Sequence, residues 1–96
     1  MAGYFLVDVV WTEEEGRRRY VEQLGETLDA FGGEFVARGP EYTSLEGDWK
    51  LDGRLVLLRF ASAEQAMEWY HSDVYAPLLA LRKSSARTRM LFFEGS

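Results

Sequence analysis

Residues 3–11, GYFLVDVVW, form the apolar run that most constrains the fold of this chain. The run is rich in β-branched and aromatic residues and too short for a typical helix, so it predicts a strand. Alternation puts Tyr4, Leu6 and Val10 on one face, and Phe5, Val7, Val9 and Trp11 on the other. Helices can cover only one apolar face. We expect a second copy of the chain to cover the other, with Phe5 and Val9 on the partner-facing side.

The remaining sequence predicts seven more elements in a regular order. A helix runs from about Glu13 to Phe31, and Gly32-Gly33 ends it. The later elements are strands at 34–38, 41–46 and 54–60, a helix at 63–70, a short helix ending near Ser85, and a strand at 87–94. This order indicates an α+β fold of the ferredoxin-like split βαβ type, with an antiparallel sheet and helices on one face.

Local signals fix several of the expected boundaries. Thr12 with Glu15 and Ser62 with Gln65 have capping-box spacing, which predicts the starts of the first two helices. Gly39-Pro40 predicts a turn before the strand at 41–46.

Length and charge narrow the function classes. The 96 residues predict a single domain, 1–96, with a net charge of −5. That charge argues against nucleic acid and anionic membranes as partners. The chain has no cysteine and one histidine, and it lacks calcium-loop and phosphate-loop spacing, so we expect neither a metal nor a cofactor. No signal peptide precedes the first strand, and a cytoplasmic location is expected.

Three predicted strands each carry one charge within an apolar run: Asp8, Arg38 and Arg59. Buried charges are paired, lie at an edge or face a ligand. If the three faces coincide, one acid and two guanidinium groups line a cavity that suits a small carboxylate or enol. The alternative is a set of salt bridges, or arginines that reach solvent at strand ends.

The stretch WYHSDVYAPLLALR, residues 69–82, gathers aromatic and polar side chains at a bend between two helices. Such residues can frame a pocket, and the candidate ligand-binding residues are Trp69, Tyr70, Ser72 and Tyr75. Plain core packing is the alternative for the aromatic ones. His71 and Asp8 are the candidates for a general acid or base, and the alternative for His71 is exposure at a helix end.

The segments FGGEFVARG at 31–39, LEGDW at 45–49 and WYHSDVYAPLLALR resemble the domain-of-unknown-function 1330 family. The resemblance covers nearly the whole chain. It implies a dimeric α+β barrel, in which ferredoxin-like subunits pair sheet against sheet, a group that includes small monooxygenases and muconolactone isomerases. It implies no particular activity. Arg17 stands where the family tends to carry an aromatic residue.

Two functions of different class follow from these observations. One is a homodimeric small-molecule-binding domain, potentially a cofactor-free enzyme acting on a small aromatic or enolisable carboxylate. The other is a non-catalytic ligand-binding or structural homodimer. The fold alone does not choose between them, because function depends on the site.

Overall fold

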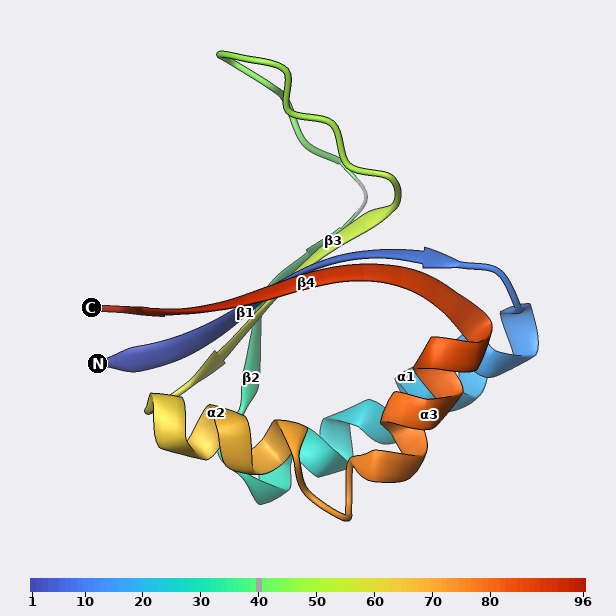
Figure 1. Ribbon diagram of the computed structural model, residues 1–96, viewed down its shortest axis with the longest axis vertical. Coiled ribbons are helices and arrows are strands. Elements are labelled where there is room, and N and C mark those ends of the chain that lie inside the picture. The colour runs from blue at the N-terminus through green and yellow to red at the C-terminus, as the bar shows by residue number, and fades with distance from the viewer. Residues whose placement is uncertain (40) are drawn as a thin grey trace.

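The computed structural model describes residues 1–39 and 41–96. Its elements are β1 (Ala2–Trp11), α1 (Glu14–Ala30), β2 (Glu34–Gly39), β3 (Arg54–Phe60), α2 (Ala63–Tyr70), α3 (Ala76–Ser85) and β4 (Ala86–Gly95). The strands form one antiparallel sheet in the order β2-β3-β1-β4. The helices lie together on one side of it (Figure 1). The α+β class, the antiparallel sheet and the placement of the helices are therefore confirmed.

The segment between β2 and β3 corrects one prediction. Residues 41–53, which we call the arm, contain no strand, and Figure 1 shows the arm standing away from the sheet. Tyr42 and Leu45 are three residues apart, so in a strand they would face opposite sides, and neither face could be buried consistently. The arm is instead held by its own contacts, such as the bond from the Leu51 N–H to the Tyr42 hydroxyl. The turn predicted at Pro40 lies outside the described residues.

The two ends of α1 are stabilised differently. At the C-terminal end, Gly32 adopts a φ of 71°. The Gly32 N–H donates to the carbonyl of Asp29, and the Gly33 N–H donates to the carbonyl of Leu28. This pattern is a Schellman motif, which the glycine pair predicted. At its start the predicted capping box of Thr12 is wrong, because Glu13 is the N-cap and no side chain caps the helix.

Packing against α3 fixes the start of α1 instead. The N–H groups of Thr12 and Glu13 both donate to the carbonyl of Ser85, the last residue of α3. Gly16 packs so closely on Ser85 that a Cβ at this position would overlap the serine side chain. The second predicted capping box is formed, because the Ser62 hydroxyl accepts a bond of 3.1 Å from the Gln65 N–H.

The register of β1 decides which apolar face meets the helices. Phe5, Val7 and Val9 belong to the buried core between the sheet and the helices, together with Leu24, Leu28, Leu58, Phe60, Trp69 and Leu78. The placement of Phe5 and Val9 on a partner-facing side is therefore wrong. A single strand with two apolar faces does not reveal which one the helices cover, whereas the chain connections do.

The other face of the sheet, here called the open face, carries no helix. Rows of directly paired residues cross it: Leu57, Leu6 and Leu91 form one row, and Arg59, Tyr4 and Phe93 form the next. Leu91 and Phe93 are exposed, and the Tyr4 and Phe93 rings stack at 5.1 Å. Within the described residues no helix is long and apolar enough to cross a membrane.

Candidate functional site

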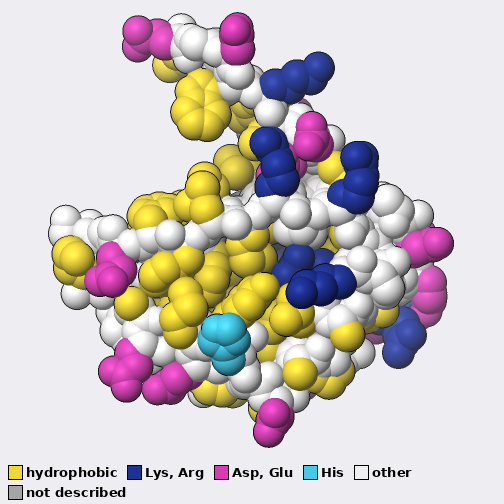
Figure 2. All heavy atoms as spheres, viewed as in Figure 1, with side chains coloured by type: hydrophobic (Ala, Val, Ile, Leu, Met, Phe, Trp, Pro, Cys, Tyr) yellow, Lys and Arg dark blue, Asp and Glu magenta, His cyan; other side chains and the backbone are white. Residues whose placement is uncertain are grey.

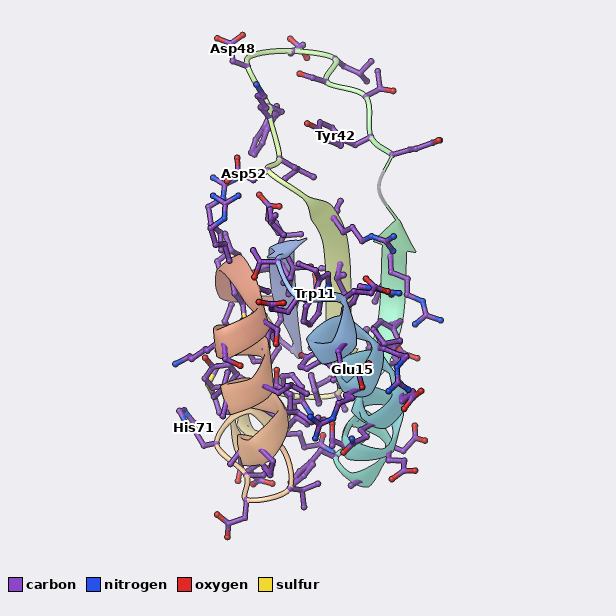
Figure 3. All side chains as sticks on the ribbon, turned by 90° about the vertical axis from the view of Figure 1, so that its right-hand side faces the viewer. Trp11, Glu15, Tyr42, Asp48, Asp52 and His71 are labelled. Atoms are coloured by element: carbon purple, nitrogen blue, oxygen red, sulfur yellow. The ribbon has the colours of Figure 1, made fainter. Side chains whose placement is uncertain are left out.

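A pocket of about 490 Å³ lies between the helix-covered face of the sheet and α1, and every helix and strand contributes to its lining. This volume is within the range of about 300–1,000 Å³ typical of small-molecule sites. Its walls are largely apolar and include the rings of Trp11, Phe35 and Trp69. Figure 3 shows Trp11 in the middle of the molecule, between α1 and the strands.

All charged residues that line this pocket within the described chain are arginines: Arg17, Arg38, Arg54 and Arg82. The chain as a whole has 16 acidic and 11 basic residues, so this concentration of positive charge runs against its overall balance. In the view of Figure 2, basic side chains lie among hydrophobic ones near the middle of the face, and acidic side chains lie toward its periphery. The pocket therefore offers a positive potential to a ligand in a protein that is otherwise acidic.

Arg82 on α3 is the buried member of this set, with only 5% of its surface exposed. It forms no ion pair with any carboxylate of the described residues. Burial lowers its pKa, but attraction to the phenol oxygens of Tyr75 and Tyr20 outweighs this and raises the pKa overall. Arg82 is thus a buried permanent cation whose neighbours are neutral phenols.

Tyr20 and Tyr75 form a buried hydroxyl pair beside Arg82, with their oxygens 2.6 Å apart. Burial is the main cause that raises the pKa of Tyr20, and the neighbouring Tyr75 raises it further. Tyr20 consequently stays a protonated donor at neutral pH. The cluster can donate hydrogen bonds to a negatively charged group, but Tyr20 cannot readily remove a proton.

Arg82 also lines a second, smaller pocket of about 280 Å³, between the end of α3 and the edge strand β4. Lys83, Tyr70 and Thr88 line it as well, and Met90 is shared with the larger pocket. Two buried polar atoms in the described chain lack a hydrogen-bond partner, the Arg82 Nε and the Thr88 Oγ1. Both belong to residues that line this small pocket.

The other three arginines of the large pocket are more accessible, and we call them the mouth. Arg38 lies with its guanidinium carbon 4.4 Å from the centroid of the Phe35 ring, a cation–π contact that holds it in place. Arg17 pairs with Glu14 on the first turn of α1. Arg38 and Arg54 form no ion pair with the described residues.

The structure does not gather Asp8, Arg38 and Arg59 around one cavity. Arg38 is opposite Val56 on the helix-covered face, whereas Asp8 and Arg59 lie on the open face. Arg59 is 3.4 Å from Glu34 of the neighbouring strand. Its role in ligand binding stays a prediction, since it is outside the lining of the large pocket.

Asp8 is buried at the base of the arm and is fully hydrogen-bonded. Its carboxylate accepts bonds from the N–H groups of Asp52 and Gly53 at 3.0 and 2.9 Å, and from Arg89 at 2.6 Å. Burial raises its pKa, but these bonds outweigh burial and lower the pKa overall. Its geometry is that of an anchor for the arm.

The aromatic residues of the stretch 69–82 divide between core and pocket. Trp69 is fully buried, lines the large pocket and donates from its Nε1 to the Thr27 hydroxyl at 3.1 Å. Tyr70 lines the small pocket, and Tyr75 is fully buried beside Tyr20. Ser72 has a local role, because its hydroxyl accepts from the Tyr75 N–H and donates to the Trp69 carbonyl.

His71 is exposed at the end of α2, with its ring edge-on to Tyr70. Figure 3 shows it at the periphery of the molecule, away from Trp11, which lines the large pocket. It does not line either pocket described above. This placement is the alternative that the sequence left open for His71.

Arg82 was missed as a site residue, although the sequence carries a signal for it. Tyr75, Leu78, Arg82 and Ser85 recur at intervals of three and four, and all four are buried. A guanidinium within the apolar stripe of a helix is out of place in a core unless something compensates it. The helical spacing of Arg82 therefore indicated a buried charge more strongly than the charged residues of the strands did, although the prediction relied on the strands.

The comparisons with known proteins settle the family. The family described as Domain of unknown function (DUF1330) matches residues 2–96. The chain belongs to the DUF1330 family. This confirms the resemblance, and the DUF1330 description itself assigns no activity. The comparison with curated proteins found no match.

Solved structures similar to this DUF1330 member support the fold. One is a protein of unknown function from Rhodopseudomonas palustris, at 18% identity and a TM-score of 0.78, over 99% of this chain and 82% of that one. A second is a dimeric ferredoxin-like protein of unknown function from Jannaschia, at 17% identity and a TM-score of 0.69, over 99% and 100%. The fold is accordingly ferredoxin-like.

A third similar structure has a described activity. It is SnoaB, a cofactor-independent oxygenase from Streptomyces nogalater, at 9% identity and a TM-score of 0.61, over 99% of this chain and 93% of that one. At this identity the likeness extends to the fold alone.

Proposed function

We propose that this DUF1330 member binds a small organic acid with an apolar body, and that Arg82 holds the carboxylate. The observation that carries the proposal is the burial of Arg82 without an acidic partner in the described chain. An isolated buried charge costs several kcal/mol, roughly, even after the protein relaxes around it. A carboxylate ligand removes this cost, because it matches the guanidinium fork in a bidentate manner.

The surroundings of Arg82 suit the two parts of such a ligand. The unsatisfied Arg82 Nε and Thr88 Oγ1 can both donate to an anionic head group. The aromatic walls of the large pocket suit an apolar body, ring-shaped or aliphatic. The ligand class is therefore an aromatic or aliphatic carboxylic acid rather than a sugar or a cation.

Catalysis on an enolisable acid is a second candidate, favoured by the cluster of Arg82, Tyr20 and Tyr75. These groups can stabilise negative charge that develops on an enolate oxygen. Deprotonation would still need a base, and the raised pKa of Tyr20 makes it a poor one. Binding is the function that the geometry supports better, and a cofactor-free reaction rests on the fold-level likeness to SnoaB. The cytoplasmic location stays a prediction.

The open face supports a further proposal, that two copies pair through it. Its middle row of Leu57, Leu6 and Leu91 is apolar, and Leu91 is 53% exposed in the single chain. An apolar sheet face of this kind is costly in water and is commonly covered. The similar Jannaschia protein is described as dimeric. Light scattering should give about twice the mass of the 11.0 kDa chain.

Paired titrations test the binding proposal. Benzoate should bind the wild-type protein and raise its melting temperature, whereas benzamide, which has the same ring without the charge, should not. Arg82→Met should abolish benzoate binding, and Arg82→Lys should weaken it, because a lysine lacks the bidentate fork. If benzoate, phenylacetate and hexanoate all fail to bind the folded wild-type protein by calorimetry, the proposal is wrong.

A further inference from the structure

We infer that the acid bound by this pocket is a dicarboxylate, with one acidic group held by Arg82 and the second by Arg38 and Arg54 at the mouth. The inference rests on the proposed function and extends it from one acidic group to two. It names a ligand class with acidic groups at both ends of an apolar body.

The positions of Arg38 and Arg54 are fixed by the register of the sheet. Arg38 is opposite Val56 of β3, and Arg54 precedes Val56 by two residues on the same face. The Cα atoms of such diagonal neighbours on adjacent strands lie about 7–8 Å apart. Like charges carried by neighbouring positions on one face of a sheet repel each other, and an anion bound between them relieves the repulsion.

The protein supplies too little negative charge to satisfy the mouth. Glu14 is the acidic residue there, and it pairs with Arg17 and also attracts Arg54. Arg38 forms no ion pair with any carboxylate of the described residues, so the one nearby carboxylate serves at most two of the three guanidinium groups. Because Arg38 is held over the Phe35 ring, it is already positioned at the rim before a ligand arrives.

The two ends of the pocket differ in burial and are separated by apolar walls. Arg82 is buried on α3, whereas Arg38 and Arg54 are exposed on β2 and β3. Val56, Leu58 and Trp69 line the same pocket. A monocarboxylate can satisfy only one end. A dicarboxylate with an apolar spacer satisfies both, and its second group keeps part of its contact with water.

The test compares acids that share a spacer but differ in the number of acidic groups. Benzoate would be compared with terephthalate and isophthalate, phenylacetate with 1,4-phenylenediacetate, and hexanoate with adipate, all by calorimetry at low ionic strength. At least one dicarboxylate should bind about five- to tenfold more tightly than its matched monocarboxylate, the gain expected of one charge-assisted bond at an exposed site.

The gain should depend on the mouth. In the double variant Arg38→Gln/Arg54→Gln, the dicarboxylate should lose its advantage while the monocarboxylate keeps its wild-type affinity. The control is Arg19→Gln/Arg87→Gln, which removes the same charge at exposed positions outside both pockets. That control should keep the advantage. Arg82→Met should abolish binding of both kinds of acid.

The outcomes separate this inference from the proposed function. If monocarboxylates bind but no dicarboxylate binds more tightly, the inference is overturned and the proposed function stands. The same holds if the advantage survives in Arg38→Gln/Arg54→Gln. If no acid binds the folded wild-type protein, both fall together.

Discussion

A buried charge lies on each side of the sheet, and the protein treats the two charges differently. Asp8 on the open face is 7% exposed and accepts bonds from two backbone N–H groups and one arginine. Arg82 of α3, on the helix side of the sheet, is 5% exposed, and its Nε lacks any partner in the described chain.

This difference indicates what each residue does. A buried charge that the protein satisfies by itself holds two parts of the chain together, here β1 and the arm. A buried charge that has no acidic partner and one unpaired N–H lowers stability, and such positions are characteristic of binding sites. The comparison therefore supports a structural role for Asp8 and the proposed ligand-binding role of Arg82, and the following predictions test that contrast.

The largest effects are expected when a glutamate replaces an apolar residue of β1, first on the helix-covered face and then on the open face. Phe5→Glu places a charge in the core and should unfold the protein, because no partner for it exists there. Leu6→Glu, one residue away, faces the open side and should leave the fold intact while preventing dimerisation. Circular dichroism and light scattering separate the two results. A folded dimer for Leu6→Glu would contradict the proposed interface.

Removal of the satisfied charge should cost stability. Asp8→Ala leaves the N–H groups of Asp52 and Gly53 without their acceptor, so we expect a loss of about 2–3 kcal/mol in the free energy of unfolding. In a domain of this size that corresponds to a fall of about 10 °C or more in melting temperature. The melts should be made at one protein concentration, since dimerisation contributes to the result. An unchanged melting temperature would show that the arm needs no anchor.

Removal of the unsatisfied charge should have the opposite sign. Arg82→Met keeps most of the side-chain volume and removes the buried cation. The free energy of unfolding should therefore stay level or rise by about 1 kcal/mol or more, and the melting temperature should follow it. The Tyr20–Tyr75 pair remains to hold the neighbouring hydroxyl groups. A fall as large as that of Asp8→Ala would mean that Arg82 is structural, and the contrast between the two faces would be lost.

The smallest effect is expected from pH. The pKa of Asp8 is lower in the folded protein than in the unfolded chain, where it is about 3.9. Its contribution is therefore complete above that value and is lost as pH falls through the folded pKa. The stability difference between wild type and Asp8→Asn, measured by urea denaturation, should shrink as pH falls below about 4. A difference independent of pH would show that the charge of Asp8 contributes nothing.

The sequence predicted the elements whose local signals agree with their burial. The apolar run of β1, the glycine pair after α1 and the Ser62 cap each fix one boundary through local chemistry, and the structure has all three. The strand expected at 41–46 failed because its apolar residues do not share a face. The cap at Thr12 failed because the helix starts one residue later, with Glu13 as its N-cap, and the Thr12 N–H bonds to Ser85 of a distant helix.

The site depended on contacts between elements that are far apart in the chain. Sequence spacing showed that Asp8, Arg38 and Arg59 interrupt apolar runs, but it did not show that Arg38 faces the helices while the others face away. Burial of Arg82 becomes visible only when α3 packs beside Tyr20 of α1 and Met90 of β4. The sequence by itself determined the α+β class, the two apolar faces of β1 and the order of strands and helices apart from the strand expected at 41–46, because these follow from alternation and local capping. Only the tertiary structure decided which face the helices cover and which buried charge lacks a partner, because both depend on long-range packing.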